Sequence, residues 1–265
     1  MRTAREIDLD GKKTSDEIKI IQITDTHLFS DKTSQLHGYC THQSLTEIIE
    51  HLIDDRLKKE DVVLLTGDIS QDESLESYRL ALIQLERLKS TVYWIHGNHD
   101  DESKIKTVFD TSKYVKKLNK FSIKNWDFIS INTCRRGTDK GYIDECEMKI
   151  FLEKVDESKK SNKNIAIVMH HHPVPVDTPL VDECGLQNSE IFLDTLNKNS
   201  EIKLVICGHV HGDYRISLGG KVIETCPATC FQWVKGTDQV KTENRKGFKV
   251  FNISTNSCSS STIFI

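Results

Sequence analysis

Five short apolar runs along the chain are each followed at once by a cluster of polar residues. In chain order the pairs are IKIIQI with TDTH, DVVLLT with GDIS, TVYWIH with GNHD, NIAIVM with HHHP, and IKLVIC with GHVH. Continuous apolar runs of this length are typical of strands that are buried on both faces. The pattern therefore predicts a sheet that is covered on both sides.

Helical patterns lie between several of these runs. Residues 43–59 repeat apolar side chains with the period of a helix, and residues 74–89 and 144–155 are also amphipathic. Strands that alternate with helices indicate an α/β fold built in layers. Ligands bind such sheets beyond the C-terminal ends of the strands, which is where the polar clusters stand.

Neither an internal repeat nor a linker rich in Pro, Gly or Ser divides the chain. We expect a polar N-terminal arm over residues 1–17, a single domain over residues 18–255 and a C-terminal tail over residues 256–265. The tail has no pattern of apolar residues that would indicate a buried element. Residues 156–164, DESKKSNKN, are expected to form a solvated loop.

Composition excludes some classes of protein. The 265 residues carry a net charge of −4, which does not suit a general binder of nucleic acid or of anionic membranes. No run approaches the roughly 20 apolar residues of a membrane span, and no apolar signal core follows the first residues. The 8 cysteines are scattered without a CxxC pair, so we interpret them as reduced thiols of a cytoplasmic protein.

The polar clusters offer ligands for metal ions. Asp25 and His27 stand two residues apart, and on an extended chain such side chains point to the same side. His209 and His211 repeat that spacing. Asp68, after a glycine that permits a tight turn, could bridge two cations, although in isolation an aspartate there would more often cap a helix.

The other two clusters are rich in histidine. In GNHD, Asn98 offers an amide oxygen and His99 a proton donor, although Gly and Asn also favour plain turns. The side chains of the three consecutive histidines at 170–172 cannot all point toward one metal ion. Eight of the 11 histidines lie in the clusters or just before one, and the other three are interpreted as structural or surface residues: His37, His42 and His51. Five such coincidences at one edge of a sheet favour a metal site.

The order DxH, GD, GNHD, H, GHxH resembles the signature of the calcineurin-like metallophosphoesterases. Longer stretches, IIQITDTHLF, TGDISQD, MHHHPVPV and CGHVHGD with CPATCFQW, resemble bacterial class III cyclic-nucleotide phosphodiesterases of the CpdA type. The resemblance spans residues 18–253. It implies a four-layer α/β/β/α sandwich, with residues 18–255 as one metallophosphoesterase catalytic domain.

The resemblance also implies two metal ions per chain. Members of the family often bind Fe together with Mn, so these are the expected metals, with Zn as an alternative. It assigns one ion to Asp25, His27 and His211, and the other to Asn98, His209 and one histidine of the triplet, with Asp68 bridging. The family position two residues before the proline selects His171, and His170 stays open. His99 would be the catalytic imidazole, oriented by Asp100.

These assignments predict a phosphodiesterase that opens 3′,5′-cyclic AMP to AMP by attack of a metal-bridging hydroxide. Two divalent cations with two carboxylates and that hydroxide leave a charge of about +1, which attracts a phosphodiester. Expected substrate contacts are His27, Asp68, Asn98, His99, His211 and Asn188, with Thr229, Cys230 and Phe231 as further base contacts. The alternatives are a phosphodiesterase or phosphatase for other substrates, such as glycerophosphodiesters, and a metal-poor scaffold that binds a protein.

Overall fold

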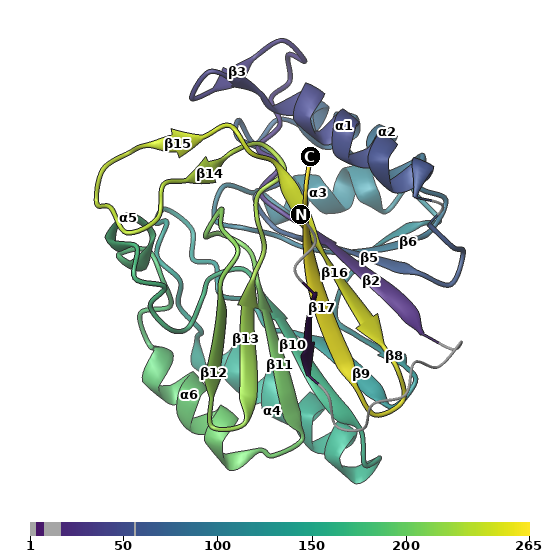
Figure 1. Ribbon diagram of the computed structural model, residues 1–265, viewed down its shortest axis with the longest axis vertical. Helices are drawn as coiled ribbons and strands as arrows, with labels where there is room; N and C mark the ends of the chain where they lie inside the picture. The colour runs from purple at the N-terminus through teal and green to yellow at the C-terminus, as the bar shows by residue number, and fades with distance from the viewer. Residues whose placement is uncertain (1–3, 8–16, 56) are drawn as a thin grey trace.

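The computed structural model describes residues 4–7, 17–55 and 57–265. Two sheets stack face to face, and helices cover their outer sides (Figure 1). This arrangement confirms the α/β fold class and its four α/β/β/α layers. Within the described ranges, none of the helices combines the length and the apolar character needed to cross a membrane.

The larger sheet has seven strands, and the last four strands of the order given below run parallel to one another. The order is β1 (Ala4–Ile7), β17 (Cys258–Phe264), β16 (Gly247–Ile253), β2 (Ile18–Ile23), β5 (Val62–Thr66), β6 (Thr91–Ile95) and β7 (Val115–Lys117).

The second sheet has six strands, of which the four central ones are parallel. The order is β12 (Arg215–Leu218), β13 (Lys221–Thr225), β11 (Ile202–Cys207), β10 (Asn164–Met169), β9 (Trp126–Ser130) and β8 (Lys120–Ile123). Two small hairpins complete the strands, β3 (Gln35–Leu36) with β4 (Tyr39–Cys40), and β14 (Gln232–Trp233) with β15 (Thr242–Glu243).

Three hydrophobic cores hold the four layers together. The outer core of the larger sheet takes side chains from α1 (Thr41–Asp54), α2 (Leu75–Glu86) and α3 (Glu102–Phe109). The outer core of the smaller sheet takes them from α4 (Glu145–Lys160) and α6 (Ser189–Lys198). A short helix, α5 (Pro179–Asp182), lies in the connection that follows β10. The third core lies between the sheets.

Each central strand serves two cores, which explains its continuous apolar run. In β2, Ile20 faces the core between the sheets and Ile21 faces the helices. In β10, Val168 belongs to the inner core and Ile167 to the outer one. Because neighbouring side chains of a strand point to opposite faces, a strand buried on both sides needs apolar residues at every position.

The carboxyl ends of β2, β5, β6, β10 and β11 lie together at one edge of the paired sheets. Buried Gln22 joins the two sheets there, because its amide nitrogen donates to Thr66 Oγ1 and to the Cys207 carbonyl, at 2.9 Å each. All five polar clusters of the sequence follow these strand ends.

Two local predictions were wrong. The tail of residues 256–265 contains β17, which pairs with both β1 and β16 and buries Cys258 and Ser260, so a polar sequence there forms an inner strand. The loop expected over 156–164 is helical up to Lys160, because α4 begins at an aspartate cap and ends in two lysines that suit its dipole. Of the expected N-terminal arm, residues 1–3 and 8–16 lie outside the described residues.

Candidate metal centre

Five of the predicted ligands adopt left-handed backbone conformations: Asp25 (φ 53°), His27 (45°), Asp68 (49°), His209 (67°) and His211 (45°). The extended geometry assumed for the two-residue spacings was therefore wrong. Such conformations cost about 1–3 kcal/mol each and persist only where the surroundings impose them. Backbone hydrogen bonds do so here: Asp25 N donates to Gly67 O at 3.0 Å, and His27 N donates to Asp68 O at 2.9 Å.

Gly67 and Gly97 let the loops after β5 and β6 lie against each other. Gly67 has φ +98°, and a Cβ there would come within 2.5 Å of His170 Nδ1. A Cβ at Gly97 would overlap the Asp68 carboxylate. The close approach of these two loops carries Asp68 into the middle of the cluster.

The first group of ligand atoms comes from Asp25, His27 and His211, all buried. His27 Nδ1 bonds Gln71 Oε1 at 2.8 Å, and His211 Nδ1 donates to the Phe231 carbonyl at 3.2 Å. With both Nδ1 protons used in this way, the two Nε2 lone pairs face each other at 3.0 Å. A cation shared between the two rings stabilises that arrangement, so this donor set fits a metal ion.

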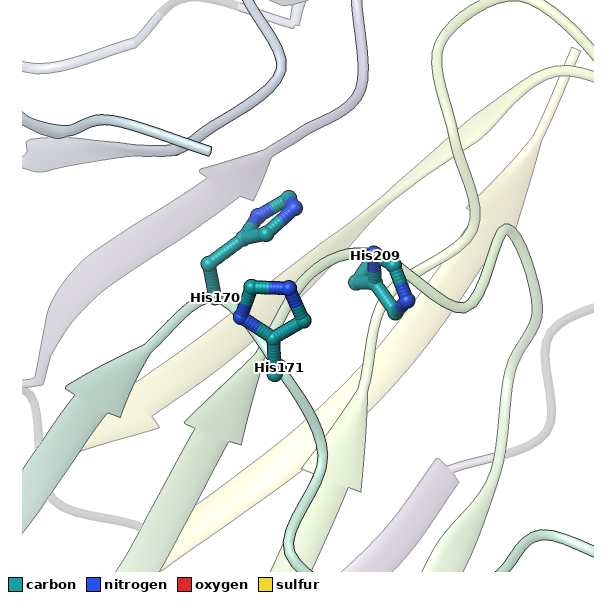
Figure 2. Close-up of side chains that lie close together, drawn as sticks. All are labelled: His170, His171 and His209. Atoms are coloured by element: carbon teal, nitrogen blue, oxygen red, sulfur yellow. The ribbon is translucent and has the colours of Figure 1, made fainter. Parts of the chain in front are cut away.

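The second group is formed around the Asn98 side chain. Its Oδ1 atom lies 3.0 Å from His170 Nε2 and 3.1 Å from His209 Nδ1. His170 Nδ1 donates to the Thr66 carbonyl at 2.8 Å, which leaves the Nε2 lone pair directed at Asn98 and Asp68. Figure 2 shows the imidazoles of His170, His171 and His209 close together beyond the strand ends.

The neighbouring His171 has both ring nitrogens engaged by protein. Its Nε2 donates to the Asp139 carbonyl at 3.1 Å, and its Nδ1 lies 2.8 Å from Thr133 Oγ1. The third histidine of the triplet, His172, bonds Asp182 at 3.2 Å. Of the three rings, that of His170 has a nitrogen directed at both Asn98 and Asp68.

Asp68 lies between the two groups. Its Oδ2 is 3.8 Å from His27 Nε2, and its Oδ1 is 3.3 Å from His170 Nε2. Oδ1 also accepts the backbone N–H of His99 at 3.0 Å. One carboxylate oxygen therefore faces each ligand group, which is the position that a bridging ligand requires.

The Asp100 carboxylate bonds mainly to backbone rather than to His99. It accepts the N–H groups of Gly97 at 2.9 Å and Ser70 at 3.0 Å, and the Tyr78 hydroxyl at 3.3 Å. Asp100 therefore ties the two loops together. The side chain that reaches His99 is Gln71, whose Nε2 lies 3.5 Å from His99 Nδ1. Sequence reasoning used Gln71 only as part of the TGDISQD stretch that carries the family resemblance and gave it no role in the site.

Burial keeps several ligand imidazoles neutral. It lowers the pKa of His27 to about 4 and holds the pKa of His211 and of His209 well below the ordinary value. A neutral imidazole has a lone pair for a cation, whereas a protonated one does not. These three rings are therefore suited to bind metal at neutral pH.

The carboxylates respond to one another and to His170. Burial raises the pKa of Asp25 to about 8. Burial also opposes the charge on Asp68, but the His170 imidazole outweighs it and holds the pKa of Asp68 well below its usual range. Burial lowers the pKa of His170, but Asp68 raises it more strongly, to about 9. Asp68 therefore shares its charge with a proton on His170, and burial opposes the charge on Asp25, so a bound cation would replace these protons as the counter-charge of the two carboxylates.

The structure brings together nearly all the predicted site residues, with one exception. The Asn188 side-chain oxygen accepts from Ile143 N at 3.0 Å, and its amide nitrogen donates to Ile143 O at 2.7 Å. Asn188 does not line the cavity beside the cluster. Of the further base contacts, Thr229 and Cys230 are fully buried, whereas Phe231 lines that cavity.

Comparison with known proteins agrees with this geometry. The family described as calcineurin-like phosphoesterase matches residues 18–213. The chain belongs to this family and is a hydrolase of phosphoesters.

Particular relatives are more informative about the branch of the family. The chain is 32% identical to a probable cyclic nucleotide phosphodiesterase of Xenorhabdus bovienii, over 89% of this chain and 96% of that protein. It is 26% identical to the 3′,5′-cyclic adenosine monophosphate phosphodiesterase CpdA of Pseudomonas aeruginosa, over 84% and 80%. Among solved structures, a dimetal phosphatase of Danio rerio has the same fold, with a TM-score of 0.67, 13% identity, and coverage of 94% of this chain and 98% of that one.

Proposed function

We propose that this protein is a dinuclear, metal-dependent 3′,5′-cyclic-nucleotide phosphodiesterase that converts cyclic AMP to AMP. The observation that carries the proposal is the position of Asp68, one oxygen of which faces each of two buried ligand groups. The printed names of the relatives support the choice of a cyclic nucleotide as substrate.

We assign the first ion to Asp25, His27 and His211, and the second to Asn98, His209 and His170, with Asp68 shared. His170 replaces the expected His171 in this assignment, because His170 Nε2 faces the proposed ligands Asn98 and Asp68, whereas the nitrogens of His171 bond to Thr133 and Asp139. A set of nitrogen and oxygen donors without thiolate suits Mn, Fe or Zn.

When bound by these residues, two such cations would supply Lewis-acid polarisation of the phosphate oxygens and a hydroxide nucleophile near neutral pH. Asp25 and Asp68 are the only anionic ligands in the assignment, so the centre keeps a positive charge for the phosphodiester. The chain excludes bulk water from it, because both carboxylates are buried.

The leaving group needs a proton, and we assign the donation of that proton to His99. In the reaction, the oxygen of water forms a bond to phosphorus while the bond from phosphorus to O3′ breaks. His99 gives a proton to O3′, and the proton that water releases restores the one on His99. The His99 backbone is held by Asp68, its ring lines the cavity, and Gln71 lies beside Nδ1, which leaves Nε2 for the leaving oxygen. General acid catalysis of this kind contributes about 10²–10⁴-fold.

The test compares kcat/KM for cyclic AMP and for bis(p-nitrophenyl) phosphate with the Mn-loaded enzyme. We expect cyclic AMP to be preferred and His99→Gln to lower kcat for cyclic AMP about 10²-fold or more. The effect on bis(p-nitrophenyl) phosphate should be smaller, because nitrophenolate leaves without a proton. A preference for the synthetic diester by orders of magnitude would overturn the assignment in favour of another diester substrate.

A further inference from the structure

The cavity beside the ligand cluster has a second wall that the proposed chemistry does not use. The cavity measures about 310 Å³, within the range of small-molecule sites. One side is formed by the ligand cluster. The other side comes from the β3–β4 hairpin, α5 and the β14–β15 hairpin, which lie around one end of the molecule (Figure 1). Its residues are Leu36, His37, Leu180, Val181, Trp233 and Val240.

His37 stands at the tip of the β3–β4 hairpin. The turn has two residues, His37 with φ +50° and Gly38 with φ +86°, and a turn with both φ values positive favours Asn or Asp in the first position. The imidazole is exposed, and it packs edge to face against Phe231 and Trp233, with ring centroids 5.3 Å away in each case. Within the described part of the chain its nitrogens make no hydrogen bond, so both are available to a ligand.

Trp233 connects this wall to the metal ligands. Its ring lies 5.5 Å from that of His211 and 5.3 Å from that of His37. A molecule that spans from the ligand cluster to His37 therefore passes over the indole. The cavity is also lined by Leu180 and by Val240, an apolar side chain with 62% of its surface exposed.

An apolar cleft with aromatic edges and one free imidazole is suited to a planar heterocycle. Its faces gain contact with aromatic and aliphatic side chains, and its edge nitrogens need a hydrogen-bond partner. We propose that this end of the cavity is the subsite for the nucleobase, packed against Trp233 and Val240, and that His37 determines specificity by bonding the base edge. This inference rests on the proposed function, since it names the part of the substrate that the metal cluster leaves unrecognised.

The test uses His37→Asn, because asparagine suits the left-handed turn and removes the imidazole. His42→Asn, on α1 outside the cavity, is the matched control. The substrates are cyclic AMP and 1-deoxyribose 3′,5′-cyclic phosphate, which keeps the phosphodiester ring and lacks the base. AMP binding to the Mn-loaded protein, measured by calorimetry, gives a readout that is independent of turnover.

We expect His37→Asn to lower the ratio of kcat/KM for cyclic AMP to that for the base-free diester about tenfold, mainly through KM, and to weaken AMP binding by a similar factor. His42→Asn should change neither quantity. Unchanged AMP affinity in His37→Asn would overturn the subsite whatever the enzyme hydrolyses. If the wild type does not cleave cyclic AMP but His37→Asn still weakens AMP binding, the proposed function fails and the subsite stands.

Discussion

Two regions of this molecule bury charged side chains, and they neutralise them in opposite ways. At the strand ends, Asp25 and Asp68 are surrounded by imidazoles and an amide rather than by lysine or arginine. At a different point between the sheets, Lys249 on β16 donates to Glu224 on β13 at 2.8 Å and to Asp213 at 2.9 Å. Arg215 and Ser260 complete the pairing of Glu224, so this second cluster, the Lys249 network, contains its own counter-charges.

The two ways of pairing buried charge indicate different roles for the two regions. A buried charge that is paired within the protein contributes to the choice of one packing, and removing one partner leaves the other uncompensated. In the strand-end cluster the counter-charge of Asp68 is a proton on His170, which a bound cation can replace. We therefore expect changes in the strand-end cluster to act on metal binding and catalysis, and changes in the Lys249 network to act on stability.

The largest effect is expected for Asp68→Asn. The substitution removes the charge shared by the two proposed ion sites, so kcat/KM for bis(p-nitrophenyl) phosphate should fall roughly 10³-fold or more. The metal-free variant should melt within a few degrees of the wild type, because the shape of the side chain is kept.

A measurement of metal binding tests the role of Asp68 independently of activity. Saturating MnCl2 should raise the melting temperature of the chelator-treated wild type by roughly 5 °C, since a ligand of the native state stabilises it by mass action. In Asp68→Asn most of that rise should be lost. An equal rise in both proteins would show that Asp68 holds no metal.

Next in size is Glu224→Ala in the Lys249 network. It leaves buried Lys249 and half-buried Arg215 beside a missing anion, so the free energy of unfolding should fall by about 3–5 kcal/mol. Urea denaturation measures this fall, and kcat per folded molecule should stay close to that of the wild type. The contrast with Asp68→Asn would disappear if Glu224→Ala lost activity at temperatures where it remains folded.

A triple variant tests whether pairing or mere polarity matters in that network. Arg215→Met, Glu224→Leu and Lys249→Met together remove all three charges and leave Asp213, which is partly exposed, to water. Apolar replacement of a whole buried ion cluster is commonly neutral or stabilising. The triple variant should therefore recover most of the stability that Glu224→Ala loses, as measured by the same denaturation curves.

A smaller effect distinguishes two neighbours in the histidine triplet. His170→Ala removes a proposed ligand and should lower metal affinity and kcat/KM about 10²-fold. His171→Ala removes a side chain that bonds Thr133 and Asp139, and should cost less than about tenfold. Metal content after gel filtration, measured by mass spectrometry, compares the two directly, and the reverse order would restore the family position at His171.

The same pair shows where sequence reasoning stops. The ligand types could be predicted because each follows a buried strand directly, and parallel strands end at the same edge. The choice between His170 and His171 depends on Thr133 and Asp139, which lie in the connection after β9, far away in the sequence. Sequence spacing contains no information on those contacts.

Other incorrect predictions from the sequence have the same cause. The left-handed conformations of Asp25 and His27 are imposed by hydrogen bonds that their N–H groups donate to the carbonyls of Gly67 and Asp68, on another strand end. The inner position of β17 depends on β1 and β16 on its two sides, whereas its own sequence is polar. Local patterns predicted the strands, and long-range contacts decided their surroundings.

The smallest effect concerns the pH dependence of stability in the Lys249 network. Burial lowers the pKa of Lys249, but Glu224 and Asp213 outweigh it and raise the pKa above its ordinary value of 10.5. A group whose pKa is raised on folding stabilises the protein below its unfolded pKa, and this contribution is lost as the pH rises through the folded value. The free energy of unfolding of the wild type should therefore decline above about pH 10. Lys249→Arg, which keeps its charge at that pH, should decline less. Parallel curves for the two proteins would show that Lys249 gains no net stabilisation from its two carboxylates, and the contrast with the strand-end cluster would then rest on Arg215 and Glu224 alone.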